Sequence, residues 1–186
     1  MHPNMIRFIT DGTSISAAQK RYTKRREWLM NECNGPIILS SPAMGPNQHY
    51  PWAHCDQPVY QDSYILYLTG INQFPLHIVL DPKSNQQHIF LPNYNATRVF
   101  WDGHSIAANH TDSESFLRAA GFTHIHSIQT FSTFLKDRMK KNPRWHLLLN
   151  ETSRKRIKDD AYKLLTTIRR LSTKPPRITN ISALSW

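Results

Sequence analysis

The sequence predicts an α/β fold, a three-layer α/β/α sandwich whose central mixed sheet has five or six strands. Segments with helical spacing of apolar residues alternate with short runs of β-branched and aromatic residues, and no internal repeat divides the chain. With 186 residues, of which 39% are hydrophobic and 19% charged, the chain is long enough for one domain with a sizeable core and short for two. We therefore expect a single domain over residues 14–186.

The amino-terminal part predicts a leader, a helix and a strand. Residues 1–13 show no periodicity and are expected to form a loosely ordered leader. Helix-forming residues follow from Ser14 or Ser16, with apolar side chains spaced along a strongly basic segment, and Gly35 marks the end of this helix. The apolar run Ile37–Leu39 then predicts a short buried strand.

A proline-rich segment, Ser40–Pro58, predicts a long loop. Loops of this length are uncommon inside compact domains unless they are functional or disordered. His49, His54 and Cys55 offer a possible set of metal ligands within this loop, but their spacing fits no standard zinc pattern. Hydrogen-bonded loop side chains are the favoured interpretation, and metal ligation is the alternative.

The next apolar runs predict the centre of the sheet. Tyr64–Leu68 is a run of β-branched and aromatic residues that ends at Gly70, and Leu76–Leu80 is a second run that ends at an Asp-Pro pair. We expect these two runs to be adjacent buried strands. Gln87–Leu91 predicts a third short strand.

Trp101 lies in a segment, Asn93–Asp102, that predicts a short helix or turn ending at Gly103. A tryptophan on a connecting segment is either a core side chain or a contact residue. From its large apolar area alone, a position in the core is favoured.

The remaining predicted elements continue to alternate. They are a helix at Thr111–Ala120, a strand at Phe122–Ile128, a helix at Thr130–Lys141, a strand at Trp145–Leu149, a long helix from Asn150 or Thr152 to Pro175 and an extended segment at Arg177–Ser182. Thr111, Asp112 and Glu114 predict a capping arrangement at the first of these helices.

Two histidines, His124 and His126, are expected to share one face of the predicted strand Phe122–Ile128, because side chains two residues apart in a strand point to the same side. Such a pair can chelate a metal. Polar residues at a sheet edge are the more common case, and we favour that interpretation.

The charge and cysteine content limit the classes of function. A formal net charge of +10 raises the question of an acidic partner such as nucleic acid. The basic residues concentrate on two predicted helices, around residues 20–26 and 154–170, which favours solvated helix faces over a nucleic-acid site. Cys33 and Cys55 are too few for a disulfide framework, and no apolar run approaches the ~20 residues that span a bilayer. We expect a cytoplasmic protein without a membrane segment.

Catalytic motifs are missing from the sequence. It contains no Gly-x-Ser-x-Gly, no His-Glu-x-x-His, no phosphate-binding glycine loop and no dinucleotide fingerprint. The adjacent carboxylates Asp159 and Asp160 lie on the long basic helix and are expected to pair with neighbouring cations. We therefore expect no catalytic residue and no metal site in this chain, which alone is expected to be inactive.

Four segments resemble those of a known family in their order and spacing. They are Gln61–Ser63, Tyr67–Gly70, Phe90–Pro92 and Trp101–Gly103, and together they look like the amino-terminal domain of aminopeptidase P, a member of the creatinase/prolidase amino-terminal domain family. The resemblance covers roughly residues 20–186. In that family this domain is a mixed sheet with helices on both faces, which agrees with the fold that the alternation predicts.

The resemblance implies a non-catalytic part of a metallopeptidase. Aminopeptidase P releases the amino-terminal residue that precedes proline, and its two manganese ions are held by a carboxy-terminal "pita-bread" domain, which we expect to be the missing partner of this chain. The amino-terminal domain then contributes to oligomer assembly and to the substrate cleft. In bacterial relatives, a tryptophan in the segment that resembles Trp101 reaches the active site of a neighbouring subunit. Trp101 thus becomes a substrate-cleft or subunit-contact candidate, and Gln61, Asp62 and Tyr67 of the other motifs are further candidates.

Two alternatives stay open. Within the same class, a prolidase would cleave Xaa-Pro dipeptides instead of longer peptides. In a different class, a pseudo-peptidase or stand-alone interaction module would use its basic surface to bind an acidic protein, with nucleic acid as a less favoured partner.

Overall fold

The computed structural model describes residues 8–41, 61–73, 75–102, 105–139, 144–148, 166 and 177–180. A sheet with the strand order β4-β3-β2-β1-β5-β6 forms its centre. The strands are β1 (Ile37–Ser40), β2 (His77–Asp81), β3 (Gln86–Leu91), β4 (His124–Ser127), β5 (Arg144–Leu147) and β6 (Arg177–Asn180). The β1–β2 and β2–β3 pairs are antiparallel, while β3–β4, β1–β5 and β5–β6 are parallel. The prediction of a mixed sheet is therefore confirmed.

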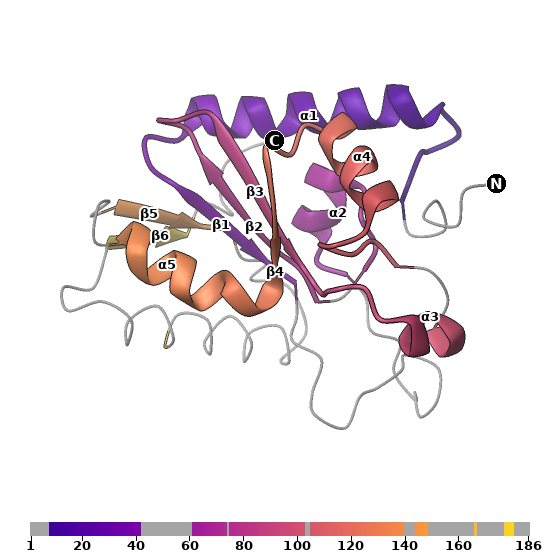
Figure 1. The fold of residues 1–186 in the computed structure, drawn as a ribbon. Coiled ribbons are helices and arrows are strands. Elements are labelled where there is room, and N and C mark those ends of the chain that lie inside the picture. The colour runs from indigo at the N-terminus through magenta and orange to yellow at the C-terminus, as the bar shows by residue number, and fades with distance from the viewer. Residues whose placement is uncertain are drawn as a thin grey trace, which may run out of the picture.

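Helices cover both faces of this sheet, as Figure 1 shows. They are α1 (Ile15–Glu32), α2 (Ser63–Thr69), α3 (Ala96–Asp102), α4 (Thr111–Ala119) and α5 (Phe131–Met139), with a short 3-10 helix, η2 (Ile128–Thr130), before α5. Helices α1, α2 and α4 lie on one side of the sheet and α5 on the other, while α3 lies at the periphery (Figure 1). This arrangement confirms the three-layer α/β/α sandwich.

Alternation along the strands divides the core between the two faces. In β1, Ile37 and Leu39 are buried in the cluster that contains the apolar side chains of α1, α2 and α4. Ile38 between them is buried in the other cluster, with Phe131 and Leu135 of α5. Because successive strand residues point to opposite faces, a continuous apolar run is what a sheet covered on both sides requires.

The prediction of a strand over Tyr64–Leu68 is wrong, because these residues belong to α2. The Asp62 side chain accepts hydrogen bonds from the amides of Tyr64 and Ile65 at 2.9 and 3.2 Å, which satisfies donors that a helix start leaves open. Gly70 ends the helix with a left-handed φ of 68°. The buried side chains of α2 have helical spacing: Ile65, Leu68 and Thr69. A short apolar run fits either element, and the capping residues at its ends decide for a helix.

The predicted capping arrangement at α4 is also wrong. The helix begins at Thr111, and its N-cap residue is His110, which makes no side-chain capping bond. Asp112 and Glu114 instead lie in the first turn of α4, where the positive end of the helix dipole favours negative charge.

Several sequence predictions concern residues outside those that the structure describes. The loop residues His49, His54 and Cys55 are among them, as is nearly all of the long helix predicted after residue 150, in which Thr166 alone is described, as helical. These predictions stay predictions.

Phe8 lies within the predicted leader and packs against the domain. It is buried, and it forms an antiparallel bridge with Ile71. The amide of Ile9 donates to the carbonyl of Gly70 at 2.8 Å, and the carbonyl of Ile9 accepts from the Tyr22 hydroxyl at 2.9 Å. These contacts hold the segment before α1 against α2.

Arg26 on α1 is completely buried, although its basic segment was expected to be a solvated face. Its guanidinium donates to Gln87 Oε1 at 2.6 Å, to the carbonyl of Leu68 at 2.8 Å and to the carbonyl of Ala120. The guanidinium also lies over the Phe122 ring, 4.3 Å from its centroid. Burial lowers the pKa of Arg26 to about 9. One cation thus connects α1 with α2, α4 and β3.

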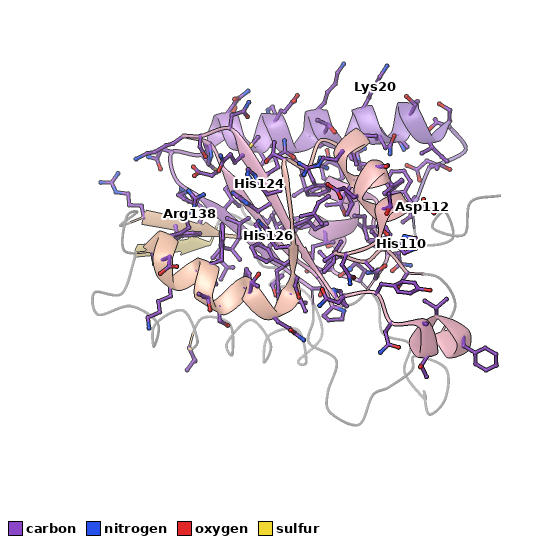
Figure 2. All side chains as sticks on the ribbon, in the orientation of Figure 1. Lys20, His110, Asp112, His124, His126 and Arg138 are labelled. Atoms are coloured by element: carbon purple, nitrogen blue, oxygen red, sulfur yellow. The ribbon has the colours of Figure 1, made fainter. Side chains whose placement is uncertain are left out.

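Elsewhere the outward side of α1 is solvated, as expected. Lys20 and Lys24 are exposed, and Lys20 points away from the sheet (Figure 2).

Replacing Arg26 is expected to destabilise the domain. Arg26→Met leaves the buried carbonyl of Leu68 and the Gln87 amide without their donor, at a cost of about 1–3 kcal/mol for each unsatisfied group. We expect the free energy of unfolding from urea titration to fall by about 3 kcal/mol. Lys24→Met on the exposed side of the same helix is the control and should stay within about 0.5 kcal/mol. Equal values for the two variants would show that the buried carbonyls do not need Arg26.

Candidate functional site

The candidate residues from the sequence lie in two parts of the structure. Gln61 and Asp62 directly precede α2 and are both 5% exposed. Tyr67 lies on α2, and Trp101 lies on α3, with its side chain outside what the structure describes.

Gln61 belongs to a buried chain of amides. Its Nε2 donates to the carbonyl of Gln73 at 2.5 Å, and its Oε1 accepts from the amide of Asp62 at 2.9 Å. The Gln73 side chain continues the chain, since its Nε2 donates to the carbonyl of Ile106 at 2.7 Å and its Oε1 accepts from the amide of Ile106 at 2.8 Å. The start of α2 is therefore connected with the segment that follows α3.

Asp62 uses its carboxylate inside the domain. Burial raises the pKa of this carboxyl group above its ordinary value, while the hydrogen bonds from the amides of Ile65 and Tyr64 act in the opposite direction. A buried carboxylate that accepts hydrogen bonds from two backbone amides stabilises the start of a helix. Its described contacts are all with the domain itself.

Tyr67 faces outward and is 42% exposed. The guanidinium of Arg25 lies over its ring, 4.0 Å from the centroid, and donates to its backbone carbonyl at 2.8 Å. This stacked pair joins α1 and α2 at the surface, and it leaves part of the Tyr67 ring accessible to another molecule.

Helix α3 carries an exposed aromatic side chain. Phe100 is 78% exposed, the largest value among the large apolar side chains that the structure describes. Tyr94, just before α3, is also exposed, and its ring lies 5.0 Å from that of His110. Exposed aromatic area next to Trp101 fits a surface that meets another molecule.

Sequence reasoning missed the residues that hold these parts together. Gln73 and Ser113 are buried, and Ser113 Oγ accepts from the amide of Ala107 at 3.1 Å. The sequence gives no signal for either residue, because Gln73 follows Asn72 and Ser113 lies between Asp112 and Glu114, so both resemble exposed polar residues.

The sequence comparison identifies the family. Residues 22–148 match the family described as "Aminopeptidase P, N-terminal domain". The chain belongs to this family. No curated protein is similar enough in sequence to count as a match.

Solved structures share the fold of this aminopeptidase P amino-terminal domain. Aminopeptidase PepP of Pseudomonas aeruginosa aligns with a TM-score of 0.63 at 20% identity, over 89% of this chain and 37% of its own. Proline aminopeptidase P II from Yersinia pestis aligns with a TM-score of 0.59 at 18% identity, over 87% of this chain and 37% of its own. The low-pH form of aminopeptidase P from Escherichia coli aligns with a TM-score of 0.59 at 16% identity, over 87% of this chain and 36% of its own. The chain thus spans little more than a third of the length of these proteins.

Within the described residues, no group of three or more histidine, cysteine, aspartate or glutamate side chains is arranged to hold a metal ion. His124 and His126 do share a face of β4, as predicted, and both rings contact His88 of β3. The rings of His124 and His126 are nearly parallel, at 4°, with centroids 6.0 Å apart.

Ser40 and His77 form a second polar pair, where β1 ends and β2 begins. Ser40 Oγ lies 2.7 Å from His77 Nδ1, and the His77 ring stacks on Phe131 with centroids 4.1 Å apart. Burial lowers the pKa of His77 to about 4. A serine beside a histidine is the start of a nucleophilic pair, but an imidazole with so low a pKa is a weak general base at neutral pH. The pair stabilises the strand ends instead.

Replacing Asp62 tests its role at the start of α2. Asp62→Ala removes the acceptor for two amides and is expected to lower the free energy of unfolding by about 1–2 kcal/mol. Asp62→Asn keeps an acceptor oxygen and is expected to change it by less than about 0.5 kcal/mol. Denaturant titration at pH 7 measures both. If Asn is as harmful as Ala, the carboxylate charge, rather than the capping geometry, is what α2 requires.

His77 is expected to make the domain less stable in acid. The unfolded chain binds a proton at His77 below its ordinary pKa of about 6.5, while the folded domain resists protonation down to about pH 4. Stability should therefore fall as pH decreases through this window, by up to about 1.4 kcal/mol per pH unit for His77. Denaturant titrations between pH 7 and pH 4.5 measure this slope.

Two variants separate titration from hydrogen bonding at this pair. His77→Phe keeps an aromatic ring against Phe131 and should remove the contribution of His77 to the slope. Ser40→Ala removes the hydrogen bond and should leave the slope in place. An unchanged slope in His77→Phe contradicts the assignment.

Proposed function

We propose that this chain is the non-catalytic amino-terminal domain of a Xaa-Pro aminopeptidase, a metallopeptidase that releases the amino-terminal residue before proline. The observation that carries this proposal is the family match over residues 22–148. The fold that the domain shares with aminopeptidase P structures, of which it covers little more than a third, supports it. The catalytic residues then belong to a further, carboxy-terminal domain of the parent protein, which would hold two manganese ions.

The domain would contribute to oligomer assembly and to the substrate cleft. Phe100 and Tyr94 support this role, because their exposed rings lie on and next to the helix that carries Trp101. We propose Trp101 as the residue closest to substrate and Tyr67 as a subunit-contact candidate. Gln61 and Asp62 would act indirectly, by holding α2 and the segment after α3 in place.

The proposed location is the cytoplasm. Cys33 is a free, buried thiol, which is compatible with a reducing compartment. Among the helices that the structure describes, none is long and apolar enough to cross a membrane.

A second candidate function is an interaction module that lacks peptidase activity and binds an acidic protein. The net charge of +10 and the exposed Lys20 and Lys24 on α1 favour it. Binding to an acidic polypeptide would then weaken steeply as salt increases, whereas affinity without salt dependence would argue against this function.

The size and activity of the native protein test the proposal. An antibody against this chain should detect, in the cells that make it, a protein roughly twice the size of this chain or larger. That protein should cleave Xaa-Pro peptides in the presence of manganese. A band at the size of this chain alone would contradict the proposal. Cleavage confined to Xaa-Pro dipeptides would identify a prolidase instead.

Replacing Trp101 in the parent protein tests the cleft role. Trp101→Ala is expected to lower kcat/KM for a Xaa-Pro tripeptide at least about tenfold, the loss of roughly 1.4 kcal/mol of transition-state binding. Trp28→Ala, which removes an exposed tryptophan of α1, is the control and should leave kcat/KM unchanged. Size-exclusion chromatography shows whether the oligomer persists. Equal losses in both variants would indicate a general effect of tryptophan removal.

A further inference from the structure

Three histidines connect the edge strand β4 with β3 on the sheet face that α5 covers. His124 and His126 are consecutive on that face of β4, as Figure 2 shows, and His88 lies opposite His124 in the parallel register of β3. The His88 and His124 rings stack with centroids 4.6 Å apart, and His88 Nδ1 lies 3.1 Å from His126 Nε2. We call these three side chains the histidine stack.

The histidine stack connects β4 with α5 as well as with β3. Phe134 of α5 lies 4.8 Å from the His88 ring and 5.6 Å from the His126 ring, measured between centroids. His126 also stacks on Phe90, with centroids 4.7 Å apart. Strand β4 is at the edge of the sheet, where β3 is its one neighbour in the strand order. The histidine stack therefore adds side-chain contacts with β3 and α5 to the ladder that pairs β4 with β3.

The contact between His88 and His126 requires that at least one of the two imidazoles is neutral. A hydrogen bond between His88 and His126 needs one ring nitrogen with a free lone pair, and two protonated rings would place two donors against each other. His88 is 2% exposed, and its Nε2 is buried with no hydrogen-bond partner among the described residues. A proton there would add a buried charge and a buried, unsatisfied donor.

The charged groups around the stack also disfavour protonation. Arg138 of α5 places a cation nearby, and Asp81 of β2, the one anion among the described residues that acts on His88, lies 3.5 Å from Arg138 and is partly neutralised by it. Burial, the other two histidines and Arg138 together lower the pKa of His88 to about 3. Burial, His124 and Arg138 lower the pKa of His126.

We propose that the histidine stack is an acid-sensitive latch, which holds β4 on the sheet and against α5 at neutral pH and releases this edge when His88 and His126 become protonated. The closed edge resists protonation. When the edge opens, His88 regains its ordinary pKa of about 6.5, so that at pH 5 its protonation alone increases the population of the open form about 30-fold. At pH 7.5 the same factor is close to one.

Hydrogen exchange of the 186-residue chain tests the latch. After correction for the intrinsic exchange rate, the amides of residues 124–127 in β4 are expected to lose protection at least about 30-fold between pH 7.5 and pH 5, and more than those of β1 and β2. His88→Phe cannot be protonated and still packs against Phe134, so its pH-dependent loss in β4 should be about 30-fold smaller. His126→Gln keeps a side-chain amide within reach of His88 and should likewise reduce the loss, which provides a second test if His88→Phe does not fold.

His77→Phe is the matched control. It removes a half-buried histidine outside the stack, so it should change the acid dependence of global unfolding and leave the extra loss in β4 intact. Two results would overturn the latch. One is a loss of protection in β4 between pH 7.5 and pH 5 that equals the loss in β1 and β2, because equal losses indicate global unfolding. The other is an undiminished loss in β4 in whichever of His88→Phe and His126→Gln folds.

Discussion

The burial of Arg26 is the constraint on which the helical layer of this domain depends. Its guanidinium bonds with groups that lie 42, 61 and 94 positions away in the sequence, and two of these groups are carbonyls at the ends of α2 and α4. Carbonyls at a helix carboxyl end lack intrahelical donors and carry partial negative charge. A cation placed between two such ends satisfies both, and it needs no carboxylate. Because all three contacts must form together, Arg26 determines where α1, α2 and α4 lie on the sheet.

The position of α2 then determines what the domain presents outward. The amide chain from Gln61 through Gln73 to Ile106 ties the start of α2 to the segment after α3. The polar side chains of Gln61 and Gln73, which could otherwise bind a ligand, thus form hydrogen bonds inside the domain. The exposed area beside them is aromatic, on Tyr67 and Phe100. Such a division fits the proposed packing of this domain against other parts of a larger protein, because aromatic rings provide contact area and buried amides keep it in a fixed place.

The layers, the mixed sheet and most element boundaries could be predicted from the sequence, because a sheet covered on both faces requires apolar runs of a recognisable length. The run Tyr64–Leu68 could not be assigned in this way, since its composition favours a strand while Asp62 and Gly70 at its ends favour a helix. Sequence reasoning also expected Arg26 to be solvated. Two of the groups it binds are backbone carbonyls, which leave no trace in side-chain patterns, and the third, the Gln87 side chain, is 61 positions away in the sequence. Of the candidate site residues, Gln61 and Asp62 could be recognised as special, but not as buried.

His124 and His126 illustrate the same limit on a smaller scale. Their spacing correctly predicts a shared face of a strand, and the sequence leaves chelation and a polar edge as alternatives. What decides between them is His88, which is 36 positions from His124 in the sequence and directly opposite it in the sheet. A third imidazole would complete a metal site only if the lone pairs converged. Here the rings stack, so His124 and His88 present their faces to each other, and the nearest ring nitrogens, on His88 and His126, share a proton. Neutral histidines packed in this way stabilise the edge only while they remain unprotonated, which turns an apparent ligand set into a pH-dependent contact.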